Sequence, residues 1–181
     1  MSEFVVADIH FEHPGITKEK GGVRHRPFTS VEEHDETIIE RWNKKVGPHD
    51  KVYIIGDVCI NRRGLAKCDR LNGKLHLIKG NHDIFDLSEY GRFYQINAYR
   101  MFENPRFLMS HMPVHPMELE RFKFNVHGHL HDKTVQMADP DWGADVQVDD
   151  PRYLCVSMEH TNYEPAALEE VYEAMRTRGI V

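Results

Sequence analysis

Five apolar segments of this chain each lead directly into polar residues of the types that bind metal ions. In chain order these residues are Asp8-Ile9-His10, Gly56-Asp57, Gly80-Asn81-His82-Asp83, Ser110-His111 and Gly128-His129-Leu130-His131. The ends of strands converge in α/β folds, and the loops that follow them commonly carry binding groups. The pattern therefore predicts an α/β fold that gathers these side chains in one place.

In two of these segments, candidate ligands stand two positions apart. Alternate residues of an extended chain point the same way, so Asp8 and His10 are expected to share a face, and so are His129 and His131. Each motif alone is weak, because the chain has 13 histidines and an isolated histidine is more often structural than a ligand. All five together favour a bound metal, since burying so many such groups without a cation would cost several kcal/mol per group.

The candidate ligands are carboxylates, imidazoles and one amide, with no thiolate among them. This set suits Mn, Fe, Zn, Ni or Co and disfavours a structural zinc site. It also exceeds what one ion requires, which favours two ions about 3.5–4 Å apart that share a carboxylate. The cysteines, Cys59, Cys68 and Cys155, are odd in number and widely spaced, and are expected to be reduced core thiols.

The order of the expected elements indicates a mixed α/β fold in a single domain, residues 1–181. Strands are expected at 4–8, 51–57, 75–83, 93–102, 106–111, 123–131 and 153–159, the fourth and fifth forming a hairpin across Asn104-Pro105. Helices are expected at 29–48, 63–71 and 164–179, the first capped by Ser30 with Glu33 or by Thr29 with Glu32. Two packed sheets with outer helices account for this order better than one doubly wound sheet.

The ordered set DxH, GD, GNH[DE], H and GHxH resembles the signature of the calcineurin-like metallophosphoesterase superfamily. All five blocks lie between residues 8 and 131, and "ADIHFEH", "RPF", "RWN" and "NYEP" further resemble small, single-domain bacterial or phage members. The resemblance implies the fold of that superfamily over nearly the whole chain. This fold is a two-sheet β-sandwich flanked by helices, in four layers α/β/β/α.

The resemblance also implies a centre with two divalent ions, with manganese as the first expectation and Fe, Zn, Ni or Co as alternatives. Seven side chains would bind the ions: Asp8, His10 and His131 the first, Asn81, His111 and His129 the second, and Asp57 both. A hydroxide bridging the metals would attack phosphorus in line. His82 would be the catalytic residue that protonates the leaving oxygen or stabilises its charge.

One position departs from the protein Ser/Thr phosphatases of this superfamily. Those enzymes carry GDxxDRG and RGNHE, whereas this chain has "GDVCINRR" and "KGNHD". Ile60 stands where they have the Asp that supports the catalytic histidine. The difference speaks against that branch and leaves the partner that orients His82 unassigned, although Asp83 is adjacent.

Other polar residues near the motifs allow two interpretations. Arg62 and Arg63 either contact phosphate or begin a solvated helix. The loop residues His13, Arg24, His25 and Arg26 either line the substrate entrance or, for most of them, are simply exposed. The remaining residues of interest are expected to be structural or to pack near the site: His34, His49, His76, His127, His160, Asn162 and Tyr163.

Charge and composition narrow the function. A net charge of −6 argues against a broad basic face for long nucleic acid, but allows a small phosphorylated substrate. Neither a secretory signal nor a bilayer-spanning run is visible, so a cytoplasmic protein is expected. The function expected is a metal-dependent phosphoesterase, foremost a phosphodiesterase acting on small or nucleotide phosphodiesters. The alternatives are a non-catalytic metal-binding scaffold for protein partners, which the retained His82 disfavours, and a nuclease.

Overall fold

The computed structural model describes residues 1–17 and 26–181, which form a mixed α/β fold. The first sheet has the strand order β11-β1-β2-β3-β4. Its strands β1 (Glu3–Val6), β2 (Lys51–Ile55), β3 (Lys74–Ile78) and β4 (Phe93–Asn97) are parallel, and β11 (Ala166–Ala167) is antiparallel to β1. The carboxyl ends of the four parallel strands therefore meet at one edge.

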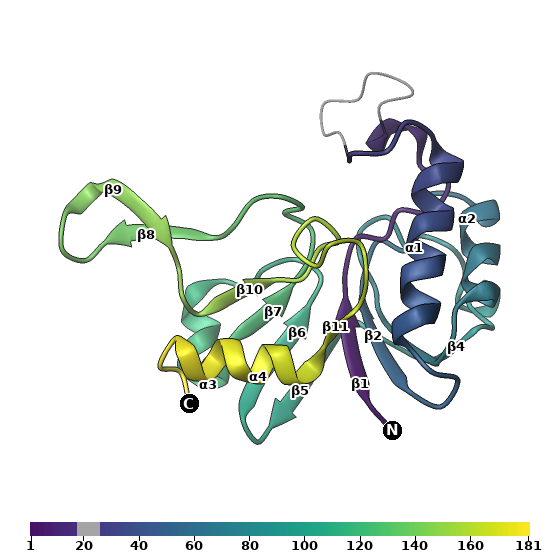
Figure 1. The fold of residues 1–181 in the computed structure, drawn as a ribbon. Helices are drawn as coiled ribbons and strands as arrows, with labels where there is room; N and C mark the ends of the chain where they lie inside the picture. The colour runs from purple at the N-terminus through teal and green to yellow at the C-terminus, as the bar shows by residue number, and fades with distance from the viewer. Residues whose placement is uncertain (18–25) are drawn as a thin grey trace.

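The second sheet has the order β10-β7-β6-β5. Strands β10 (Tyr153–Cys155), β7 (Asn125–His127) and β6 (Arg106–Ser110) are parallel, and β5 (Tyr99–Glu103) is antiparallel to β6. A separate hairpin of β8 (Gln136–Asp139) and β9 (Gly143–Asp149) projects from the body of the molecule (Figure 1).

Four α-helices lie in the described part of the chain: α1 (Val31–Lys45), α2 (Arg62–Lys67), α3 (Leu119–Phe122) and α4 (Leu168–Thr177). Short 3-10 turns occupy Pro14–Ile16, Cys68–Arg70, Leu87–Glu89 and Pro116–Glu118. Helix α1 begins at the first of the two predicted caps, because Ser30 Oγ accepts the Glu33 backbone N–H at 3.1 Å. No helix among these residues is long and apolar enough to cross a bilayer.

The core lies on both faces of the first sheet. On one face, Val6 and Ile54 pack in a cluster that includes Ile38 and Trp42 of α1. On the other, alternate residues of the same strands pack with the second sheet and α4, in a cluster that includes Val5, Ile55, Phe107, Val126 and Val171. Strands buried on both faces read as continuous apolar runs, which is why the sequence reveals them. The three cysteines are free and buried, as predicted.

The predicted strand at 93–102 is two strands. Strand β4 ends at Asn97 and pairs with β3, whereas β5 begins at Tyr99 and pairs with β6 in the other sheet. The predicted hairpin across Asn104-Pro105 is therefore formed by β5 and β6 alone. Hydropathy does not show which sheet a strand joins, because that depends on partners distant in the chain.

Candidate metal centre

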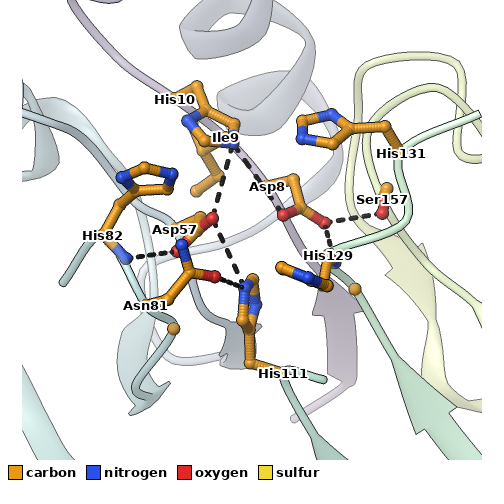
Figure 2. Close-up of polar contacts among 12 residues, drawn as sticks. Asp8, Ile9, His10, Asp57, Asn81, His82, His111, His129, His131 and Ser157 are labelled. Carbon is orange, nitrogen blue, oxygen red and sulfur yellow. Dashed lines mark hydrogen bonds and ion pairs between the residues drawn. The ribbon is translucent and has the colours of Figure 1, made fainter. Parts of the chain in front are cut away.

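The predicted ligands meet where strands of both sheets end (Figure 2). Asp8 and His10 follow β1, and Asp57 follows β2. Asn81 and His82 come from the loop after β3, and His111 directly follows β6. His129 and His131 lie in the turn after β7. Residues more than 120 positions apart are thus in contact, as the Asp8 Oδ2 bond from the His129 backbone N–H at 2.8 Å shows.

Six of these side chains form two groups that could each hold a metal ion. Within each group the potential ligand atoms all lie within 4.8 Å of one another, and the groups are Asp8, His10 and His131, and Asp57, His111 and His129. Asp57 Oδ2 lies 3.4 Å from His111 Nε2 and 3.7 Å from His10 Nε2, so this carboxylate stands between the groups. Asn81 Oδ1 is 3.0 Å from His111 Nε2 and joins the second group.

Left-handed backbone turns aim these side chains. Asp8 and His10 both have φ of 56°, Asp57 has 53°, and His129 and His131 have 70° and 56°. Non-glycine residues rarely adopt this region, at a cost of about 1–3 kcal/mol each, and they concentrate at functional sites. The prediction from extended alternation is wrong for His129 and His131, which point to different groups. The side chains of Asp8 and His10 do join one group, but left-handed backbone at these two residues brings them there, not an extended chain.

The glycines of the GD, GNHD and GHxH motifs give these groups room. A Cβ on Gly56 would lie 2.3 Å from His111 Nδ1, and one on Gly80 would lie 2.3 Å from Asp57 Oδ1. A Cβ on Gly128 would lie 2.6 Å from Asp8 Oδ2. Each distance is far below van der Waals contact. The glycines are therefore required for close approach of the backbone to the candidate ligands.

The buried polar atoms fit a cation. Asp8 Oδ1 and both ring nitrogens of His10 are buried without a hydrogen-bond partner among the described residues. Burial first, and then the positive charge of Arg26, lower the pKa of His10 well below its ordinary value. The imidazole is therefore neutral, the form that binds metal. His111 Nδ1 donates to the Ile55 carbonyl at 3.0 Å, which orients the ring so that Nε2 faces Asp57 and Asn81.

Glu159 and Arg26 hydrogen-bond to residues that carry the candidate ligands, a role that the sequence did not identify. Glu159 Oε1 accepts from His131 Nδ1 at 3.0 Å and from Arg26 Nε at 2.9 Å. Burial opposes ionisation of Glu159, but the His131 hydrogen bond and the charge of Arg26 bring its pKa down to about 2. The carboxylate is thus ionised and fixes the tautomer and the orientation of His131.

Arg26 is buried, not an exposed loop residue as most of its segment was expected to be. Its guanidinium donates to the backbone carbonyls of Asp8 and Ile9, which holds the turn that carries Asp8 and His10. Ser157 adds a hydroxyl donor to Asp8 Oδ2 at 2.6 Å. One available signal was that Glu159, like the ligands, ends an apolar run, "YLCVSME".

Asp83 holds the loop after β3 through hydrogen bonds to the backbone and does not orient His82. Its carboxylate accepts the backbone N–H groups of Asp57 and Gly80 at 2.8 Å and of Val58 at 3.0 Å. The His82 backbone N–H donates to Asp57 Oδ1 at 2.9 Å, while its exposed ring lies beside that of His10, 5.7 Å between centroids. No side chain in the described ranges hydrogen-bonds to the His82 ring.

Of the other polar residues predicted near the motifs, some border the centre and some do not. Arg62 pairs with Glu89 and Arg63 with Glu12 at the exposed start of α2, which favours the helix-start interpretation for both. The half-buried His13 has its ring 5.5 Å from that of His10 and borders the centre, whereas residues 24 and 25 lie outside the described ranges.

The predicted structural residues lie around the centre or away from it. Tyr163 packs against Phe28 and beneath Arg26, and Asn162 accepts from Arg41. His34 contacts Arg26 and Asp35, His76 contacts Gln95, and His127 is buried beside Gly128. His49 and His160 are exposed.

Replacing Glu159 by Gln tests the support of His131. Gln keeps the shape but removes the charge that holds the ring, so we expect the affinity for Mn²⁺ to fall about 10- to 100-fold. Titration calorimetry measures it. Glu169→Gln on the exposed face of α4 is the matched control, with wild-type affinity expected. Equal affinities in the two variants would contradict a positioning role for Glu159.

Comparison with known proteins gives the fold but no activity. No family model matches the chain. It is 29% identical over 185 residues to an uncharacterized protein of Methanocaldococcus jannaschii, covering 98% of this chain and 93% of that one. It is 38% identical to the gene 66 protein of Mycobacterium phage L5 over 58 residues, 29% of this chain and 28% of that one.

Two solved structures are similar as well. One is a protein of unknown function from Aquifex aeolicus, with a TM-score of 0.66, 24% identity and coverage of 95% of this chain and 98% of that one. The other is a novel archaeal phosphodiesterase, with a TM-score of 0.47, 17% identity and coverage of 87% and 82%. The likeness to the Aquifex protein shows that the two chains share a fold.

Proposed function

We propose that this protein is a dinuclear-metal-dependent phosphoester hydrolase of the calcineurin-like metallophosphoesterase type. The observation that carries the proposal is the convergence of two three-residue ligand groups with Asp57 between them. A donor set of carboxylates, imidazoles and one amide suits Mn, Fe, Zn, Ni or Co, and the resemblance makes manganese the first of these to test. The two-sheet core, with α1 on one side, supports the four-layer arrangement of that superfamily.

Each side chain has a role in this proposal. The first ion would be held by Asp8, His10 and His131, the second by Asn81, His111 and His129, and both by Asp57. Two bound divalent ions would supply a nucleophilic water at neutral pH and neutralise charge on the phosphoryl oxygens. A phosphodiester is the proposed substrate because it keeps two organic arms, and the exposed Asn81 and His82 leave one side of the centre open to them.

His82 is proposed as the catalytic residue. Asp57 fixes its backbone through the N–H bond at 2.9 Å, while the ring is exposed at the mouth of the centre. With no hydrogen bond to the described residues, the ring is free to meet the leaving oxygen of the substrate. There it would donate a proton or stabilise the developing negative charge.

Hydrolysis of bis-p-nitrophenyl phosphate tests the proposed activity. We expect turnover with added Mn²⁺, its loss on addition of a chelator, and its return when the metal is restored. Absence of turnover with Mn²⁺, Fe²⁺, Zn²⁺, Ni²⁺ and Co²⁺ would refute the hydrolase and leave the metal-binding scaffold. Digestion of single-stranded DNA at rates matching those of small diesters would identify a nuclease instead.

Replacing His82 by Ala separates catalysis from metal binding. We expect turnover to fall about 100- to 10,000-fold, the usual contribution of a positioned acid, while both ions stay bound. Turnover of the diester and metal content per chain are measured on the same preparation. His115→Ala, an exposed histidine outside the centre, is the control. Loss of an ion from the His82 variant would show that its role is ligation.

A further inference from the structure

Two adjoining cavities lead from the candidate metal centre over the second sheet. The nearer, of about 350 Å³, is lined by Asn81 and His111 together with Lys79 and Met112. The farther, of about 430 Å³, is lined mainly by Tyr99, Met101, Leu108, Val114 and Phe122. Ala98 and Ser110 line both, so the cavities form one groove, called here the apolar groove.

Strand register explains why the groove has an apolar wall. Met101 of the edge strand β5 stands opposite Leu108 of β6, and Tyr99 stands opposite Ser110. Phe102, the next residue along β5, turns the other way and stacks on Phe107 at 4.4 Å in the core. Tyr99 and Met101 consequently face outward and are 55% and 43% exposed. Apolar cavities beside a few convergent polar groups are typical of small-ligand sites in proteins.

We propose that the apolar groove binds the aromatic base of a nucleoside phosphodiester whose phosphate lies at the metal centre. This proposal rests on the proposed function and names its substrate class. It follows from the order of groups along the groove. The ligand residues Asn81 and His111 line the nearer cavity, and the apolar cavity follows it. That is the order of phosphate and base in such a substrate.

The farther cavity has the chemistry that a base requires. The exposed phenol of Tyr99 offers a π-face, and the thioether of Met101 packs favourably against aromatic rings. Glu118 and Arg121 also line it, and Arg121 lies 5.3 Å from the Phe122 ring centroid. Their charged ends can hydrogen-bond to the polar edge of a base, which a purely aliphatic arm would leave unpaired. Its volume falls within the ~300–1,000 Å³ typical of small-ligand sites.

Two esters with the same leaving group test the proposal. Thymidine 5′-(p-nitrophenyl phosphate) carries a base, and methyl p-nitrophenyl phosphate does not. In Tyr99→Ala we expect the ratio of kcat/KM for the thymidine ester to that for the methyl ester to fall about 10-fold, since base stacking is lost. Tyr94→Ala, an exposed tyrosine of β4 outside both cavities, should keep the wild-type ratio. An unchanged ratio in Tyr99→Ala overturns the proposal.

A binding experiment that needs no turnover tests the base site separately from the proposed hydrolase activity. Thymidine is titrated into protein with ¹³C-labelled methionine methyl groups and with metal removed by a chelator. We expect resonance shifts at Met101 and Met112, and none at Met137 of the projecting hairpin. A chain that hydrolyses neither ester but shows these shifts loses the proposed activity and keeps the base site. The proposal is overturned if thymidine causes no shift at Met101. It is also overturned if the Met101 resonance moves with protein concentration and not with thymidine, because the groove then binds a second copy of this chain.

Discussion

Replacing Asp57 by Asn is expected to remove both metal ions and reduce diester hydrolysis about 1,000-fold or more. The Asp57 carboxylate lies near a ligand of each group, with Oδ2 3.7 Å from His10 Nε2 and 3.4 Å from His111 Nε2. An amide has nearly the same shape, but it carries no charge and its NH₂ group repels a cation. Manganese per chain, measured by mass spectrometry after gel filtration, and turnover should fall together.

Asp69→Asn is the matched control, because Asp69 is an exposed carboxylate in the Cys68–Arg70 turn away from the centre. That variant should keep its metal and its turnover. The shared role of Asp57 would be wrong if its variant retained two ions per chain. Retention of one ion with activity lost would mean that Asp57 belongs to one group only.

Replacing Gly80 by Ala is expected to disrupt the centre without adding or removing any ligand. The new Cβ would lie 2.3 Å from Asp57 Oδ1 and 2.6 Å from the Asp57 nitrogen, so this carboxylate or the loop must shift. Overpacking of this kind costs about 1–3 kcal/mol. A displacement of roughly 1 Å in a reacting group reduces turnover about 100-fold. We expect a lower melting temperature, weaker Mn²⁺ binding and turnover reduced by about that factor.

Gly91→Ala separates steric conflict from a general effect of losing glycine. A Cβ at Gly91 meets nothing within 4 Å, so stability, metal binding and turnover should stay at wild-type values. Wild-type turnover in Gly80→Ala would show that the loop relaxes without moving Asp57, and would contradict the assigned role of the motif glycine.

Several elements could be predicted because their signals are local. The cap at Ser30 and the apolar face with Ile38 and Trp42 predict α1, and the doubly buried runs predict β1, β2 and β3. The division of 93–102 between two sheets could not be predicted. Neither could the hairpin β8–β9, whose residues are largely polar and exposed and give no apolar run.

The sequence by itself determined which side chains are available as ligands, where glycine must stand among them, and that each set follows a strand. Tertiary structure alone decided how the ligands are divided between the two groups. His129 and His131 are two residues apart yet join different groups, because left-handed turns rotate them away from each other. It also decided that Arg26 and Glu159, 133 positions apart, meet behind His131 and that an apolar groove adjoins the centre. Such contacts form only when the sheets pack, so local sequence carries no record of them.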